Sequence, residues 1–283
     1  MVSIAEARRR VLDILQQAGI EDAGFDCTQL LARVLGCHPL TAEEISEDAF
    51  SRLLALAHRR AAREPLQYVL GEWDFLDVTL AVGPGVLIPR PETEEVCLAA
   101  VFALKNDKTP AVLDLCAGSG AMALGLQSRI PGAQVTAVEL QADAFAYLCK
   151  NVAAYAQTHT PAPRAVQADA LVFHQSLAPG SVDLVMCNPP YVTEAEYASL
   201  APEVLQEPKA ALVAPDNGLF FYRRIAQDYF AVLRPGGHIV FETGAGQGAA
   251  VQELLRQNGY TAIEIRPDAA GKSRIALGQK PAQ

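Results

Sequence analysis

This sequence lacks several features that would place a protein in a membrane, outside the cell or around a metal ion. No apolar run reaches the roughly 18 residues that a membrane-spanning helix needs, so we expect no membrane partner. Residues 1–10 contain arginines but not the apolar segment and cleavage site of a signal peptide. The six cysteines form no C-x-x-C pair, and the five histidines have no metal-ligand spacing. We therefore expect a cytoplasmic protein with reduced thiols and no bound metal.

Positive charge is also scarce, because 23 Lys and Arg face 32 Asp and Glu and the formal net charge is −9. Such an acidic chain is a poor match for proteins that neutralise nucleic-acid phosphates, so we expect no direct nucleic-acid binding. Hydrophobic residues make up 51% and charged residues 19%, a composition that excludes disorder and permits a large core. A length of 283 residues indicates about two domains.

The N-terminal part, residues 1–71, repeats apolar side chains at helical spacing. We predict a small bundle of three to five short helices, with Gly36 ending one of them. Thr41 and Glu44 have the spacing of a capping box that would open another. Residues 72–88 then change to short strand patterns separated by glycine and proline, which predicts a β-hairpin linker to the second domain.

Residues 89–283 alternate between apolar strand patterns and helical patterns. This alternation predicts an α/β fold with a doubly wound, mostly parallel sheet, which binds ligands at the carboxyl ends of its strands. A helix is expected over residues 220–233, stopped by the Pro-Gly-Gly at 235–237. Seven strands are expected, at residues 111–116, 134–140, 164–168, 182–187, 238–243, 260–266 and 273–277.

The first of these strands leads into a glycine turn with a G-x-G-x-x-A pattern, whose glycines are Gly118 and Gly120. Glycines allow a tight turn and close approach of the backbone to a ligand. Glu139 ends the next strand, where an acid can bind both hydroxyls of a ribose. A dinucleotide and S-adenosylmethionine both fit this pattern. Asp114 favours the second, because its carboxylate would repel a pyrophosphate but could receive the ammonium of a methionine, directly or through water.

A second motif, Asn188-Pro189-Pro190-Tyr191, follows the strand at 182–187. The two prolines restrict the backbone, and Asn188 is pushed toward an extended conformation because it precedes a proline. The side-chain carbonyl of Asn188 and the backbone carbonyl of Pro189 can then face one point. Two acceptors suit the two N–H bonds of a planar –NH2 group, on which Tyr191 can stack.

Together these motifs resemble the HemK/PrmC family, the N5-glutamine methyltransferases of peptide chain release factors. The Asn-Pro-Pro-Tyr motif alone is shared with adenine-N6 DNA methyltransferases. Its combination with R-E-P-L-Q-Y and I-P-R-P-E-T-E segments is far more specific. The resemblance covers nearly the whole chain and rests on residues 63–71, 87–95, 113–120, 188–191, 203–212 and 216–219.

The resemblance implies a Rossmann-like methyltransferase domain at 89–283 and a helical domain at 1–71 that docks a release factor. It further implies S-adenosylmethionine as cofactor, S-adenosylhomocysteine as product, and a monomer. The catalytic residues that it implies are Asn188, Pro189, Pro190 and Tyr191. Cofactor binding would fall to Asp114, Cys116, Ala117, Gly118, Ser119, Gly120, Glu139, Leu140, Asp169, Ala170 and Asn188. Substrate binding would fall to Arg90, Glu92, Asn188, Pro189 and Tyr191.

Some residues depart from the family pattern or leave alternatives open. Cys116 and Ala117 replace a usual glycine and threonine, which should alter the turn somewhat, and Ala170 stands where relatives often have an aromatic residue. Arg90 and Glu92 could bind substrate, order the cofactor pocket or form an interdomain salt bridge. Glu242 has no assigned role. Two alternative functions are methylation of a glutamine in a ribosomal protein and methylation of adenine in DNA. Two others are a nucleotide-dependent oxidoreductase and a non-catalytic adaptor protein.

Overall fold

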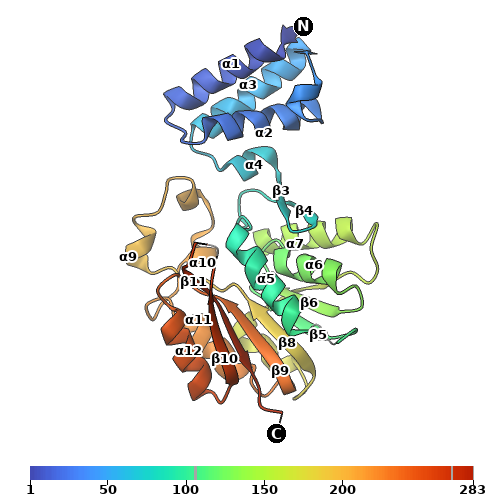
Figure 1. The fold of residues 1–283 in the computed structure, drawn as a ribbon, viewed down its shortest axis with the longest axis vertical. Helices are drawn as coiled ribbons and strands as arrows, with labels where there is room; N and C mark the ends of the chain where they lie inside the picture. Colours follow the sequence, from blue (N-terminus) through green and yellow to red (C-terminus); the bar gives the residue numbers. More distant parts are fainter. Residues whose placement is uncertain (105–106, 269, 283) are drawn as a thin grey trace. The chain divides into compact units, whose positions relative to one another are not determined.

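The computed structural model describes residues 1–104, 107–268 and 270–282 (Figure 1). Packing divides the chain into two compact units. The first consists of residues 1–72 together with 201–206, and the second of residues 73–200 and 207–283. The inclusion of residues 201–206 in the first unit has no counterpart in the sequence patterns.

The first unit is built mainly from helices. Its large helices pack against one another through buried leucines such as Leu15, Leu30 and Leu53 (Figure 1). Gly36 ends one helix in a left-handed conformation, as predicted. Its elements are β1 (Val2–Ser3), α1 (Ile4–Gln17), α2 (Ala23–Leu35), η1 (Pro39–Thr41), β2 (Glu44–Ile45), α3 (Glu47–Ala61), α4 (Leu66–Leu70) and η3 (Val204–Gln206).

The predicted capping box at Thr41 and Glu44 is wrong. Thr41 ends the short η1 turn, and Glu44 pairs as a strand with the N-terminal residues. Helix α3 begins only after Ser46, whose extended backbone lets its hydroxyl accept a hydrogen bond from the Ala49 N–H at 3.1 Å. The spacing at Thr41 fits a cap, but the chain there turns into a strand pair instead.

Charged side chains hold residues 201–206 within the first unit. The Arg60 guanidinium donates to the buried Asp26 carboxylate at 2.7 Å and to Glu203 at 3.0 Å. Arg63 donates to the same Glu203 oxygen at 3.1 Å, and the Gln206 side chain donates to the Arg63 carbonyl at 2.8 Å. Hydrogen-bonded charges of this kind are strongly coupled when they are buried, so removal of one leaves another without a partner.

The second unit contains a seven-stranded sheet with the order β10-β11-β9-β8-β5-β6-β7. Strands β5 to β9 run parallel, and β11 runs antiparallel to both of its neighbours. This confirms the predicted doubly wound, mostly parallel fold. The strands are β5 (Ala111–Leu115), β6 (Gln134–Glu139), β7 (Arg164–Gln167), β8 (Val182–Cys187), β9 (Leu233–Glu242), β10 (Thr261–Pro267) and β11 (Ser273–Gln279).

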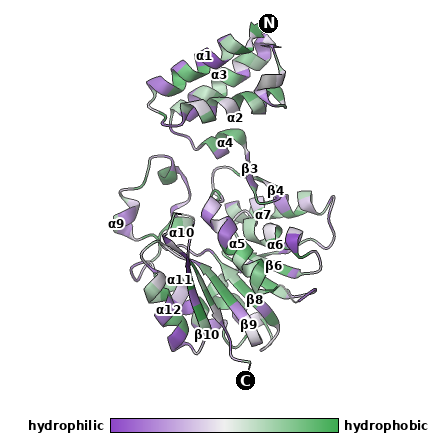
Figure 2. Ribbon diagram, viewed as in Figure 1, coloured by the Kyte–Doolittle hydropathy of each residue, from purple (hydrophilic) through white to green (hydrophobic). Residues whose placement is uncertain are grey.

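Both faces of the sheet are covered by helices, so its central strands are largely apolar (Figure 2). In β8, Leu184 and Met186 pack into the core beneath α5, α6 and α7, while Val185 and Cys187 pack beneath α11 and α12. The helices of this unit are α5 (Pro91–Ala103), α6 (Ala121–Arg129), α7 (Ala142–Tyr155), α8 (Ala170–Phe173), η2 (His174–Ser176), α9 (Glu194–Tyr197), α10 (Lys209–Leu212), α11 (Phe220–Asp228) and α12 (Gly248–Gln257).

A short hairpin, β3 (Glu72–Phe75) and β4 (Val78–Ala81), comes before this sheet in the chain. Its apolar residues Phe75 and Leu80 are buried in the same core as α5 and α6. Within the described ranges of the chain, none of the helices combines the length and apolarity needed to cross a membrane.

The region around Pro235 differs from the sequence prediction. Helix α11 ends at Asp228, and β9 already begins at Leu233, so the Pro-Gly-Gly lies inside a strand. Gly236 adopts a φ of 80°, and the pairing with β8 shifts register between Val182 and Leu184. This irregularity is a bulge, the position in a sheet where proline and glycine are tolerated.

Candidate active site

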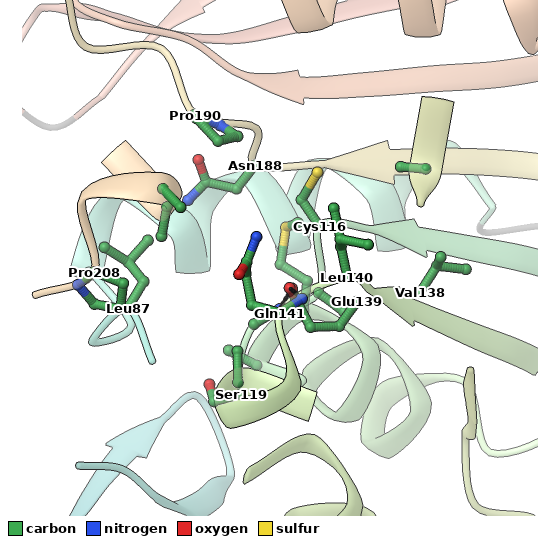
Figure 3. A pocket seen from close by; sticks show the side chains of 18 of the residues that line it. Leu87, Cys116, Ser119, Val138, Glu139, Leu140, Gln141, Asn188, Pro190 and Pro208 are labelled. Carbon is green, nitrogen blue, oxygen red and sulfur yellow. Dashed lines mark hydrogen bonds between the residues drawn. The ribbon is translucent and has the colours of Figure 1, made fainter. Parts of the chain in front are cut away.

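The candidate site lies at the carboxyl ends of β5, β6 and β8. The chain leaves β5 toward β6 and β7, but leaves β8 toward β9 on the other side, so the strand order reverses between β5 and β8. A cavity of about 990 Å³, counted to its open mouth and here called the main cavity, lies at this point. The lining residues include Gly118 and Asp169. Figure 3 shows Glu139, Leu140, Asn188 and Pro190 around the same cavity.

The glycine turn, residues 116–120, has a conformation that few side chains tolerate. Gly118 and Gly120 have φ values of 55° and 85°. A Cβ atom on Gly120 would lie 2.6 Å from Leu148 Cδ1, so only glycine fits there. Cys116 has a φ of 56° and thus keeps the left-handed conformation that glycine favours, at a cost of roughly 1–2 kcal/mol.

Asp114 lies behind the glycine turn and does not line the main cavity. Its Oδ2 atom accepts a hydrogen bond from the Ala123 N–H at 2.9 Å, which anchors the start of α6. Its Oδ1 atom is buried and accepts no hydrogen bond from any described residue. Burial raises the pKa of this carboxyl to about 8. A buried acceptor without a donor is unusual in a native protein and fits a ligand or water that brings a donor.

Glu139 connects the glycine turn to the end of β6. Its side chain is buried, and its two carboxylate oxygens accept from the Gly118 and Gln141 backbone N–H groups, each at 2.8 Å. Each carboxylate oxygen has a second lone pair. Because Glu139 also lines the main cavity, it can still accept hydrogen bonds from the hydroxyls of a ligand.

Residues that follow β6 and β7 also line the main cavity. Leu140 does so although half of its surface is exposed, as does the buried Ala170, which begins α8 shortly after β7. Asp169 caps the short helix α8, because its Oδ1 atom accepts from the Leu171 N–H at 2.8 Å. The predicted cofactor residues after β6 and β7 therefore lie together around one space.

The Asn188-Pro-Pro-Tyr191 turn forms another wall. The Asn188 amide nitrogen donates to the Thr93 hydroxyl at 3.3 Å, and no described residue donates to its amide oxygen. Pro190 lines the main cavity, whereas Pro189 is buried and does not. Among the described residues, none donates a hydrogen bond to the Pro189 carbonyl. Both expected acceptors thus lack a donor among the described residues, but only Asn188 lines the main cavity.

Arg90 forms an ion pair with Glu207, whose other oxygen accepts from the Ile88 N–H at 2.9 Å. Both partners belong to the second unit, so the alternative of an interdomain salt bridge is wrong for Arg90. Arg90 also lines a small cavity together with Asn188, Tyr191 and Glu242. Glu92 lines neither cavity.

Three residues that the sequence patterns did not single out complete the site. Thr93 lines the main cavity, and the buried Glu207 forms the ion pair with Arg90. Gln141 stands beside Glu139 (Figure 3). Thr93 and Glu207 belong to the segments 87–95 and 203–212, yet nothing local distinguishes them from ordinary polar residues near helix starts. In the described part of the chain, no cluster of three or more His, Cys, Asp or Glu side chains could hold a metal ion.

Comparisons with known proteins show which family this chain is similar to. Residues 6–71 match the model of the PrmC N-terminal domain, and residues 78–217 match a model described as conserved hypothetical protein 95. The release factor glutamine methyltransferase of Vibrio cholerae is 36% identical over 98% of this chain and 97% of its own length. That of Cereibacter sphaeroides is 37% identical over 98% of this chain and 99% of its own.

Solved structures share the fold. A Pyrococcus furiosus methyltransferase matches 83% of this chain and all of its own, with a TM-score of 0.50 and 16% identity. The catalytic domain of hMettl16 matches 86% of this chain and 84% of its own, with a TM-score of 0.55 and 17% identity. The fold is therefore the Rossmann-like fold that these methyltransferases have. More narrowly, the chain belongs to the release factor glutamine methyltransferase family.

Proposed function

We propose that this protein transfers a methyl group from S-adenosylmethionine to the side-chain amide nitrogen, N5, of a glutamine in a peptide chain release factor. S-adenosylhomocysteine is the second product. The observation that carries the proposal is the position of Asn188, whose free amide oxygen lies at the same cavity as the glycine turn and Glu139. The full-length similarity to release factor glutamine methyltransferases supports the choice of acceptor.

The residues around the main cavity fit S-adenosylmethionine. The free lone pairs of Glu139 suit the ribose hydroxyls, and Leu140 and Ala170 offer apolar surface to the adenine. The unsatisfied Oδ1 atom of Asp114 suits the ammonium of the methionine part, reached through water because Asp114 stands behind the turn. When bound, this cofactor supplies an electrophilic methyl group on its sulfonium.

The Asn188 side-chain oxygen and the Pro189 carbonyl would accept the two N–H bonds of the glutamine amide. These two hydrogen bonds hold the nitrogen in one orientation and withdraw little electron density from it. Catalysis is then mainly by positioning, and the two acceptors also stabilise the positive charge that grows on the nitrogen. Tyr191 would pack on the planar amide. A strong general base is not required before transfer, since the alkylated amide is acidic and loses its proton readily.

The central test replaces Asn188 with alanine and measures two quantities separately. Transfer of labelled methyl groups to a release factor should fall at least about 100-fold, because both a hydrogen bond and the orientation of the amide are lost. Cofactor affinity, measured by calorimetry, should change little. Asn258→Ala, at the end of α12, serves as the matched control. Unchanged turnover in Asn188→Ala would remove the basis of the proposal.

The acceptor class is tested with labelled cofactor and a cytosolic extract. A labelled protein of release-factor size supports the proposal, whereas labelled DNA or a labelled ribosomal protein supports one of the alternatives. We also propose that the enzyme works as a cytoplasmic monomer and that the first unit docks the protein acceptor. The second point predicts that a whole release factor is a better acceptor than a short glutamine peptide of the same local sequence.

A further inference from the structure

A buried carboxylate lies beneath the Asn188-Pro-Pro-Tyr191 turn and contacts it by two routes. Glu242 is the last residue of β9 and is 1% exposed. Its Oε2 atom accepts from the Thr93 hydroxyl at 2.5 Å, and its Oε1 atom accepts from the Tyr191 hydroxyl at 3.1 Å. Thr93 in turn accepts from the Asn188 amide nitrogen at 3.3 Å. A continuous chain of hydrogen bonds therefore runs from Glu242 to Asn188.

Which group donates and which accepts in this series of hydrogen bonds follows from the number of protons that each group carries. An ionised carboxylate can only accept, and a threonine hydroxyl has a single proton to donate. Because that proton goes to Glu242, Thr93 can only accept from Asn188. Asn188 must then turn its –NH2 toward Thr93 and its carbonyl oxygen away from it. The same carbonyl oxygen is the acceptor that a substrate amide requires.

We propose that Glu242 and Thr93 are positioning residues that hold the Asn188 side chain in its acceptor orientation for the substrate amide. The inference rests on the proposed function. Glu242 does not line the main cavity and acts through Thr93, whereas Thr93 lines the cavity and in this role bonds to Asn188 rather than to the reacting atoms. Without the carboxylate, Thr93 can donate to the Asn188 oxygen, which turns the amide –NH2 toward the substrate –NH2. Two donors then face each other, and the substrate amide is no longer bound.

The orientation of the Asn188 amide depends on the ionised state of Glu242. Burial raises the pKa of Glu242, while the two hydroxyl donors and Arg274 act in the opposite direction. Protonation would give Glu242 a donor of its own and release the Thr93 proton toward Asn188. The charged and titratable groups that face Glu242 are Tyr191 after β8, Arg274 on β11, Glu92 on α5, Tyr222 on α11, and Arg90 across the small cavity.

The test compares near-isosteric variants of both residues in the full-length enzyme. Glu242→Gln and Thr93→Val should each lower kcat for release-factor methylation about 10- to 100-fold, the effect of losing a hydrogen bond to a charged group. Affinity for S-adenosylhomocysteine should stay within about twofold, since the glycine turn and Glu139 are untouched. Thr93→Ser, which keeps the hydroxyl, should restore most of the activity. Glu253→Gln, the same chemical change at an exposed site on α12, is the control.

A pH profile at saturating cofactor separates positioning from a general structural role. In the wild type and in Thr93→Ser, kcat should fall as the pH drops through the pKa of Glu242, because the orienting charge is lost. Glu242→Gln and Thr93→Val should lack this fall in kcat at low pH, the acid limb of the profile. Folding is checked by thermal unfolding. Should Glu242→Gln fail to fold, the Thr93→Val and Thr93→Ser pair decides alone.

The possible failures are distinguishable. If the wild type methylates no release factor, the proposed function fails and the positioning inference falls with it. If the wild type is active and folded Thr93→Val keeps its kcat and its acid limb, the positioning inference is wrong while the function stands. Equal activity of Thr93→Ser and Thr93→Val would also overturn it, because only one of them has a hydroxyl.

Discussion

The Glu139 carboxylate accepts a hydrogen bond from the Gly118 backbone N–H at 2.8 Å, so the acid at the end of β6 orders the glycine turn at the end of β5. One side chain thus has two tasks, because it shapes the turn and also faces the main cavity. Replacement of its charge should therefore affect the cofactor site through both the turn and the ligand contacts.

Glu139→Gln tests this double role. A glutamine has the same shape, but its –NH2 would face a backbone N–H donor from either Gly118 or Gln141. We expect affinity for S-adenosylhomocysteine to fall about 10- to 100-fold, as one acceptor is lost and the turn is less well ordered. Calorimetric titration measures this, with Glu253→Gln as the exposed control. An unchanged affinity would contradict the assignment of Glu139 to the cofactor.

Asp114 predicts how stability depends on pH. Its pKa is raised from 3.8 when unfolded to about 8 in the native state, so the folded protein binds the extra proton between these values. The contribution of Asp114 is thus most favourable at low pH and is lost as pH rises toward 8. The free energy of unfolding of Asp114→Asn should fall less steeply between pH 5 and 8 than that of the wild type. Parallel curves from denaturant titrations would rule this out.

Gly120→Ala should be strongly destabilising. The new Cβ would lie 2.6 Å from Leu148 Cδ1 in a backbone conformation with φ of 85°. We expect a loss of about 2–4 kcal/mol from overpacking and left-handed strain together. Gly180→Ala is the matched control, because Gly180 also has a positive φ, of 68°, but has open space around it. The difference between the two variants in denaturant midpoint isolates the steric part, and equal losses would show that Leu148 moves freely aside.

Cys116 should react with an alkylating agent in a cofactor-dependent way. Its thiol lines the main cavity and is partly exposed, whereas burial raises the pKa of the neighbouring Cys187 thiol and keeps it inert. S-adenosylhomocysteine should slow labelling of Cys116 but not that of the exposed Cys37 and Cys149. Peptide mapping by mass spectrometry resolves the three sites. Equal protection of all three, or none of Cys116, would contradict the placement of the cofactor.

The sequence predicted those parts of the molecule that depend on neighbours along the chain. Apolar segments predicted six strands within a residue or two of their observed bounds, and the signal is strongest in central strands such as β5 and β8, which are buried on both faces. The seventh, β9, begins five residues earlier than expected, since tolerance of a proline and two glycines depends on a bulge against β8. For the same reason the helix was expected to continue to residue 233, whereas α11 ends at Asp228 and β9 begins at Leu233.

The glycine turn and the Asn-Pro-Pro-Tyr turn were also predictable from the sequence. Proline restricts φ and glycine permits positive φ values at any position in a chain. The contacts between these turns and the rest of the site were not. Thr93 and Glu242 are 149 residues apart, and Arg90 and Glu207 are 117 apart. Only the tertiary fold brings each pair together. The sequence by itself thus determined the fold class and the two binding turns, whereas the tertiary structure decided which buried carboxylates support them.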